Sequence, residues 1–208
     1  MNATNRVTSK DGTAIAYERR GRGPALILVG GGLDDGSENA PLASKLAQHF
    51  TVYNYQRRGR GGSGDTPPYA VEREVEDIAA LIARAGGTAD LYGVSSGGAL
   101  VLEAAHAGVA ANKLAVYAVP YDTAPNTARP SHDDPAANAV ATGGNAGPLE
   151  AAADVIAAAL PRGQRLRLED QSHVPDPAVL GPVLNASSWD NAWARRSSNS
   201  ILVDILRR

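Results

Sequence analysis

Gly93-Val94-Ser95-Ser96-Gly97 is the stretch that decides the fold of this 208-residue chain. It follows the apolar run 89–94 and opens the Ala/Leu-rich run 96–107. A strand, a sharp Gly-x-Ser-x-Gly turn and a helix, in this order, form a nucleophile elbow, which presents a serine hydroxyl beside a base and over backbone N–H donors. The sequence therefore predicts Ser95 as a nucleophile. The alternative is a Gly/Ser turn with no chemistry, because the pattern alone is weak in a chain with 22 glycines.

Apolar runs of strand length alternate with helical stretches along the rest of the chain. Strands are predicted over 13–18, 25–29, 51–55, 89–94, 113–119, 139–142 and 164–168. Helices are predicted over 40–49, 71–85, 96–107, 149–160 and 177–184. This alternation predicts a single α/β domain over 1–208, with a mostly parallel central sheet and helices on both faces.

Composition excludes several classes of protein. The formal net charge of −2 argues against a polyanion binder, so no nucleic-acid partner is expected. The absence of cysteine excludes disulfides, thiolate metal sites and cysteine nucleophiles. Residues 1–12 contain no signal-peptide core, and the longest apolar runs are too short for a bilayer. We expect a cytoplasmic protein without membrane partners, and the abundant alanine and arginine suggest a bacterial source.

The order of four motifs resembles the α/β-hydrolase superfamily, in its esterase-like branch. They are Val29-Gly30-Gly31-Gly32, Arg57-Arg58-Gly59-Arg60-Gly61-Gly62-Ser63-Gly64, the elbow at 93–97 and Gln171-Ser172-His173. The resemblance covers residues 13–184. It implies that Ser95 attacks, that His173 is the general base, and that the backbone N–H groups of Ser96 and Gly32 form the oxyanion hole. On local grounds too, His173 is the best of the four histidines, because it lies in a polar turn directly after a predicted strand.

The third member of the triad departs from the family pattern. The turn 143–147, where the family usually carries an acid, contains no carboxylate. Some relatives place the acid one strand earlier, and there the chain offers Asp122, which we predict over Asp133 or Asp134. Asn145 could orient the imidazole instead, with less stabilisation of its charged form. It is also open that none of these residues pairs with His173.

Two further departures concern loops. Gln56 stands where the family more often has aspartate, which indicates a change in loop support. The interval 120–138 is too short and too rich in Pro, Asn and Asp for the helical cap that many relatives insert. We therefore expect a minimal cap or none, and a shallow, wet pocket. Either the substrate is large, or a second chain closes the site as a homodimer.

Several other motifs have simpler explanations. Residues 59–64 match Gly-x-Gly-x-x-Gly, but Pro67-Pro68 follows where a dinucleotide site needs a helix. The same stretch is interpreted as an arginine-rich loop at the rim of the sheet. His49 and His106 end predicted helices, and His132 lies in a solvated acidic loop. No metal or organic cofactor is predicted.

The extension 185–208 lies beyond the resemblance and holds both tryptophans, Trp189 and Trp193. Leu202, Ile205 and Leu206 have helical spacing. The simpler interpretation is a last helix on its own sheet. The alternative is that this tail shields the area left open by the missing cap, within one chain or across a dimer.

Together these observations predict a serine hydrolase that cleaves a carboxylic ester, thioester or lactone, a small-molecule substrate, through an acyl-enzyme. Two alternatives remain open. One is a binding or assembly protein that has kept the fold and lost hydrolysis. The other is a cyclase or lyase of a biosynthetic pathway that reuses the oxyanion hole and His173.

Overall fold

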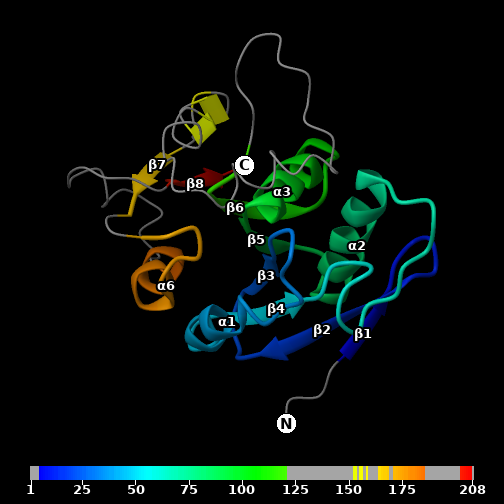
Figure 1. The fold of residues 1–208 in the computed structure, drawn as a ribbon. Helices are drawn as coiled ribbons and strands as arrows, with labels where there is room; N and C mark the ends of the chain where they lie inside the picture. The colour runs from blue at the N-terminus through cyan, green and yellow to red at the C-terminus, as the bar shows by residue number, and fades with distance from the viewer. Residues whose placement is uncertain are drawn as a thin grey trace.

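Eight strands form one sheet in the computed structural model, which describes residues 5–120, 152–153, 155–156, 158, 164–168, 171–185 and 202–207 (Figure 1). The strands are β1 (Asn5–Thr8), β2 (Ala14–Arg20), β3 (Ala25–Val29), β4 (Thr51–Tyr55), β5 (Ala89–Val94), β6 (Ala111–Tyr117), β7 (Gln164–Arg167) and β8 (Leu202–Arg207). The helices are α1 (Ala40–Leu46), α2 (Val71–Arg84), α3 (Ser96–His106) and α6 (Pro177–Asn185).

The sheet is mixed, with parallel strands at its centre. Its strand order is β1-β2-β4-β3-β5-β6-β8-β7. The pairs β4/β3, β3/β5 and β5/β6 are parallel, whereas β1/β2, β2/β4, β6/β8 and β8/β7 are antiparallel. The carboxyl ends of four parallel strands therefore meet at one edge, which is where open α/β sheets bind their ligands.

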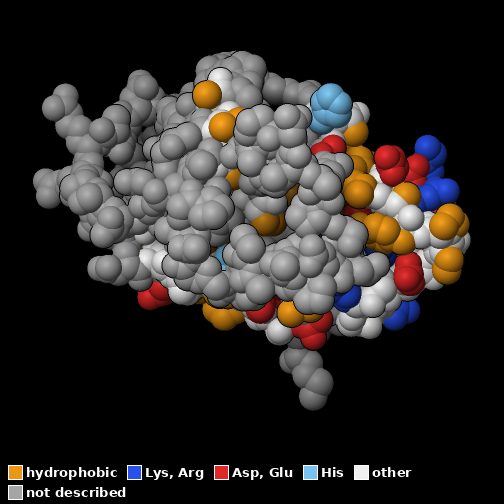
Figure 2. Space-filling model, turned by 45° about the horizontal axis from the view of Figure 1, so that its top comes forward, with side chains coloured by type: hydrophobic (Ala, Val, Ile, Leu, Met, Phe, Trp, Pro, Cys, Tyr) orange, Lys and Arg blue, Asp and Glu red, His pale blue; other side chains and the backbone are white. Residues whose placement is uncertain are grey.

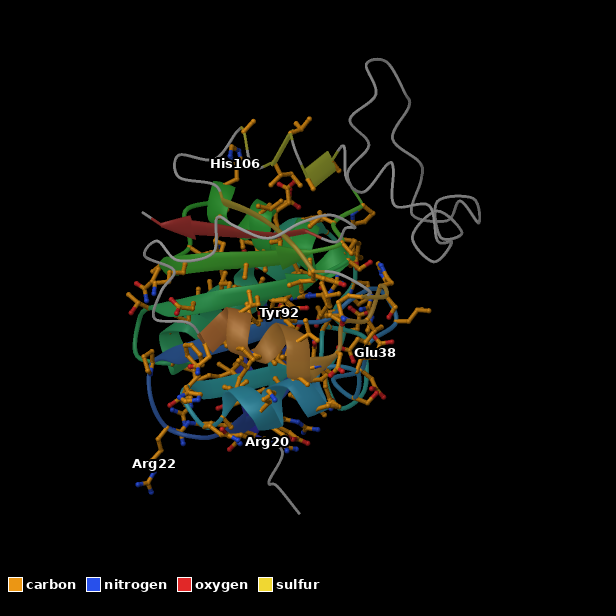
Figure 3. The ribbon with its side chains drawn as sticks, turned by 90° about the vertical axis from the view of Figure 1, so that its left-hand side faces the viewer. Arg20, Arg22, Glu38, Tyr92 and His106 are labelled. Atoms are coloured by element: carbon orange, nitrogen blue, oxygen red, sulfur yellow. The ribbon has the colours of Figure 1, made fainter. Side chains whose placement is uncertain are left out.

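Helices cover both faces of the sheet, as predicted (Figure 1). On one face, α2 and α3 bury Ile78, Leu81 and Val101 against the central strands. On the other, α1 and α6 bury residues such as Leu46 and Leu180. Tyr92 belongs to this second cluster and lies beside α6 in Figure 3. The α/β class is thus confirmed, with a hydrophobic core on each side of the sheet.

Local sequence explains where the long helix α2 begins and ends. Glu72 and Glu74 lie in its first turn and Arg84 in its last, which suits the helix dipole at both ends. Gly86 and Gly87, both with positive φ, follow its end. A stripe of apolar residues faces the core, and Glu74 and Asp77 are buried among them.

Most predicted elements are present with nearly the predicted bounds. The strands over 25–29, 51–55 and 89–94 are correct to the residue. Described residues within the predicted helix 149–160 are helical, and the predicted strand over 139–142 lies outside the described residues. The short strand β1 was not predicted. Its four residues include a single large apolar side chain, Val7, so its alternation is weak.

The helix expected for the end of the chain is wrong at residues 202–207. They form β8, an antiparallel strand between β6 and β7. A short run of Leu, Val and Ile does not distinguish a buried helix from a strand by its period alone. Here the free edge of β6 is available for backbone pairing. Both tryptophans, the rest of the tail and residues 121–150, where the missing cap was predicted, lie outside the described residues.

Charge and hydropathy of the described part follow the composition. Figure 2 shows acidic and basic side chains next to one another on the described part of the face that it presents. None of the helices among the described residues has the length and apolar character needed to cross a membrane.

Candidate active site

Ser95 lies at the carboxyl end of β5, directly before α3, in a strained backbone conformation. Its φ of 55° and ψ of −128° are unusual for a residue other than glycine. Its N–H donates to the Tyr117 carbonyl at 2.8 Å, and its own carbonyl accepts from the Gly98 N–H at 2.9 Å. A Cβ on Gly93 or Gly97 would collide with neighbouring backbone, which explains the small residues of this motif. The result is a tight strand-to-helix turn with serine at its apex.

The glycine loop, defined as Gly30-Gly31-Gly32, follows β3 and lies opposite this turn. A Cβ built on Gly31 would lie 3.5 Å from the Ser95 Cβ, and one on Gly32 would lie 3.6 Å from the Ser96 Oγ. Ser96 is the first residue of α3, where a backbone N–H has no intrahelical acceptor. The structure thus brings Ser95, Ser96 and Gly32 together.

Arg57 connects the glycine loop to the start of α3. Its Nη1 donates to the Ser96 Oγ at 3.0 Å and to the Gly30 carbonyl at 3.3 Å. Its Nε and Nη2 each donate to a carboxylate oxygen of Glu74 at 2.6 Å. Arg60 reaches the same loop, since its Nη1 donates to the Gly31 carbonyl at 2.8 Å.

The two arginines directly before the predicted rim loop 59–64 are buried. Arg57 is 6% exposed and Arg58 is 5% exposed, and each forms a two-pronged ion pair with a carboxylate of α2. Burial alone would lower the pKa of the Arg57 guanidinium, but its bonds to Glu74 raise that pKa above the ordinary value. Burial alone would raise the pKa of the Glu74 carboxyl, but the bonds to the Arg57 guanidinium lower that pKa below its ordinary value. The Arg57–Glu74 pair is therefore charged on both sides.

His173 follows β7 and is connected to the elbow through Tyr117. The Tyr117 hydroxyl donates to the Ser172 carbonyl at 2.6 Å, while the Tyr117 carbonyl accepts from the Ser95 N–H. His173 is half-buried, and burial lowers the pKa of its imidazole, which favours the neutral form. The described residues include no hydrogen bond between Ser95 and His173. Catalytic hydrogen bonds are often long in structures without substrate.

The predicted acids lie outside the described residues. These are Asp122 and the alternatives Asp133 and Asp134. Asn145 and His132 also lie outside the described residues. His106 is the last residue of α3, as predicted (Figure 3). The prediction that His49 ends a helix is wrong, because α1 ends at Leu46 and His49 lies in the turn beyond it. Within the described ranges there is no group of three or more His, Asp or Glu that could hold a metal ion.

Gln56 and Asp34 support the loops around the site. The Gln56 side chain accepts from the Gly62 N–H at 2.5 Å, which agrees with a change in loop support. Asp34, 3% exposed, accepts from the backbone N–H groups of Gly36 and Glu38 and from the Asn39 side chain. Burial raises the pKa of this carboxyl despite those bonds. Figure 3 shows Glu38 at the opposite end of the sheet from Arg22, the end to which β3 leads.

Sequence reasoning missed the roles of Arg57, Arg60 and Asp34. A signal for the first was present in the sequence. Glu74 and Asp77 are spaced three apart in a helix whose other inward positions are apolar, and buried carboxylates require cationic partners. The adjacent arginines 57 and 58 are the matching pair.

Comparison with known proteins places these features in one family. The sequence model of the alpha/beta hydrolase family matches residues 25–204. An alpha/beta hydrolase structure from Sphaerobacter thermophilus DSM 20745 is 33% identical with a TM-score of 0.76, over 87% of this chain and 98% of that one. The structure of esterase RhEst1 from Rhodococcus sp. ECU1013 is 26% identical with a TM-score of 0.51, over 56% of this chain and 46% of that one.

Among curated proteins, the uncharacterized hydrolase YraK of Bacillus subtilis (strain 168) is 34% identical over 107 residues. This match covers 50% of the chain but 40% of YraK, so the chain spans less than half of that relative's length. The solved structures that the chain resembles include both esterases and epoxide hydrolases.

Proposed function

Because this chain belongs to the alpha/beta hydrolase family, we propose that it hydrolyses a carboxylic ester, thioester or lactone through an acyl-enzyme on Ser95. The observation that carries the proposal is the strained turn at Ser95, with the backbone of Gly32 and Ser96 beside it. Strain of this kind persists where the surrounding structure enforces it, and it is typical of active sites.

The proposed reaction has two halves. The Ser95 Oγ attacks the carbonyl carbon while the neutral His173 imidazole takes the hydroxyl proton, and the N–H groups of Ser96 and Gly32 bind the resulting oxyanion. The carbon–oxygen or carbon–sulfur bond then breaks, and His173 returns the proton to the alcohol or thiol. Water attacks the acyl-enzyme with His173 as base, which releases the acid and restores Ser95.

Apolar side chains beside the site support a substrate with an apolar portion. Leu33, directly after Gly32, is 95% exposed, and Val174, directly after His173, is half exposed. An exposed leucine next to an oxyanion donor offers contact area for an alkyl or acyl group.

The direct test is labelling of the intact chain with a fluorophosphonate, followed by mass spectrometry of the modified peptide. Label on Ser95 together with hydrolysis of p-nitrophenyl acetate supports a hydrolase. An unlabelled, folded protein would favour the binding or assembly alternative. Label without hydrolysis would favour a cyclase or lyase. Sedimentation at micromolar concentration tests the proposed homodimer separately.

The acid of the triad is tested by substitution. We expect Asp122→Asn to lower kcat at least about a hundredfold at neutral pH, because an imidazole without its carboxylate is poorly oriented and its charged form less stable. Asp133→Asn and Asp134→Asn are matched controls that should keep kcat. Unchanged turnover in Asp122→Asn would transfer the role to Asn145 or leave the triad without an acid.

The dependence of rate on pH follows from the burial of His173. Burial lowers the imidazole pKa, and the neutral form is the base, so kcat/KM should rise with pH and level off early. The midpoint of this rise is expected below the ordinary histidine value of about 6.5. Initial rates between pH 4.5 and 8 measure it. A midpoint above 7 would contradict the assignment of this half-buried imidazole as the base.

A further inference from the structure

A single guanidinium nitrogen touches both sides of the proposed oxyanion hole. Arg57 Nη1 bonds the Gly30 carbonyl on the glycine loop and the Ser96 hydroxyl at the start of α3. These segments are separated by more than sixty residues of chain, and each contributes one of the two proposed N–H donors. The position of Arg57 therefore bears on the distance between the two donors.

The orientation of the loop peptides follows from the same contacts. In a trans peptide the carbonyl of one residue and the N–H of the next point in opposite directions. Arg57 binds the Gly30 carbonyl and Arg60 binds the Gly31 carbonyl, so the N–H groups of Gly31 and Gly32 point away from the two arginines. Glycines have no side chain to hold such an orientation, and two consecutive peptides here are each fixed by a charged donor.

Arg57 is itself held in one place. Glu74 binds its Nε and Nη2 in a two-pronged pair, and the Tyr69 hydroxyl donates to the Glu74 Oε1 at 2.9 Å. A planar guanidinium fixed on one edge presents its remaining nitrogen in a single direction. Lysine has one nitrogen and cannot bind Glu74 and the loop in this geometry.

From these contacts we infer that Arg57, supported by Arg60, is a positioning residue that aligns the Gly32 and Ser96 N–H groups for the oxyanion. This inference rests on the proposed function. It assigns Arg57 a role in stabilising the transition state, with no direct contact to the substrate. The positive charge next to the loop also favours the negative oxygen that develops there.

Arg58 provides a matched control, because it is similarly buried and also forms a two-pronged ion pair with a carboxylate of α2. It binds Asp77 in a two-pronged ion pair and Asp11 at 2.9 Å, and it also donates to the Arg73 carbonyl, away from the glycine loop. Lysine at 57 or at 58 breaks a two-pronged pair in the same way. Both variants should therefore lose thermal stability to a similar degree, and only one of them disturbs the loop.

The experiment compares kcat and KM for p-nitrophenyl acetate in Arg57→Lys and Arg58→Lys, each corrected for the folded fraction. We expect Arg57→Lys to lower kcat about 30- to 100-fold with KM changed less than about threefold, approaching the loss of an oxyanion donor. Arg58→Lys should keep kcat within about threefold. The inference would be overturned if both variants kept the wild-type kcat, or if both lost kcat to the same extent.

Two additions keep the test decisive. If Arg57→Lys does not fold, Arg60→Met removes the bond to the Gly31 carbonyl at a half-exposed position and should lower kcat about tenfold. Amide hydrogen exchange of the peptide spanning the glycine loop should be faster in Arg57→Lys and in Arg60→Met than in Arg58→Lys. A wild-type protein that neither hydrolyses esters nor takes the label contradicts the proposed function, whereas unchanged exchange contradicts the role of the arginines.

Discussion

Replacing Ser95 with alanine should abolish fluorophosphonate labelling and lower ester hydrolysis at least about 10⁴-fold, because no acyl-enzyme can form without the Ser95 oxygen. The variant should fold normally, since alanine removes one hydroxyl and retains the Cβ. Labelling mass spectrometry and initial rates at saturating substrate measure the two effects. Catalysis that remains would come from the oxyanion donors and binding alone.

Ser96→Ala is the matched control for this variant. Ser96 contributes its backbone N–H, which alanine keeps, while the hydroxyl that accepts from Arg57 is lost. We expect full labelling and a kcat lowered less than about tenfold, because Glu74 and the Gly30 carbonyl still hold Arg57. A label on Ser96 in the wild-type protein would refute the assignment of the elbow.

Breaking strand β8 should have the second large effect. Ile205 pairs with Ala115 of β6 on one side and with Gln164 of β7 on the other. Proline at 205 lacks the N–H needed for the ladder and is excluded from strands inside a sheet. In Ile205→Pro, β7 should separate from the sheet, and the His173 loop that follows β7 should lose its support. We expect activity to fall more than about a hundredfold, with aggregation at the exposed edge of β6.

The control for this change is Ile205→Val, which preserves β-branching and the backbone N–H. It should keep the activity and the oligomeric state of the wild-type protein. Circular dichroism, light scattering and kcat distinguish the two variants. An Ile205→Pro protein that remains monomeric and active would show that β8 does not hold β7 in place.

The central strands and the helix α2 could be predicted from the sequence, because the pattern of apolar residues within each segment is enough to identify it. The run of β3 is continuously apolar and those of β4 and β5 are mostly apolar, as is typical of buried parallel strands, and α2 carries an apolar stripe at helical spacing. The run 202–206 gave the wrong answer because short apolar runs satisfy both periods. Its partner, β6, lies far away in the sequence and decides the outcome through backbone pairing.

The candidate site divides in the same way. Ser95 and Ser96 belong to a motif whose glycines, Gly93 and Gly97, are required by close approach of backbone to backbone. Gly32 was predicted from the family resemblance alone. The pairing of Arg57 with Glu74 had a signal in the sequence, but its contact with Gly30 did not, because that contact depends on where an earlier loop lies. Such three-way contacts require the relative placement of elements. The proposed acid, Asp122, still depends on experiment.

The place of β8 also sets an order of events during synthesis. Strands β1 to β6 emerge first from the ribosome and can pair among themselves, whereas β7 pairs with β8, which follows it in the sequence. At about 5–20 residues per second, the edge of β6 stays open for several seconds before β8 arrives. The nascent chain therefore already carries its serine turn while the histidine loop has no sheet to rest on. On this view the proposed hydrolysis requires β8, and a nascent chain that stops before residue 202 should be inert toward esters.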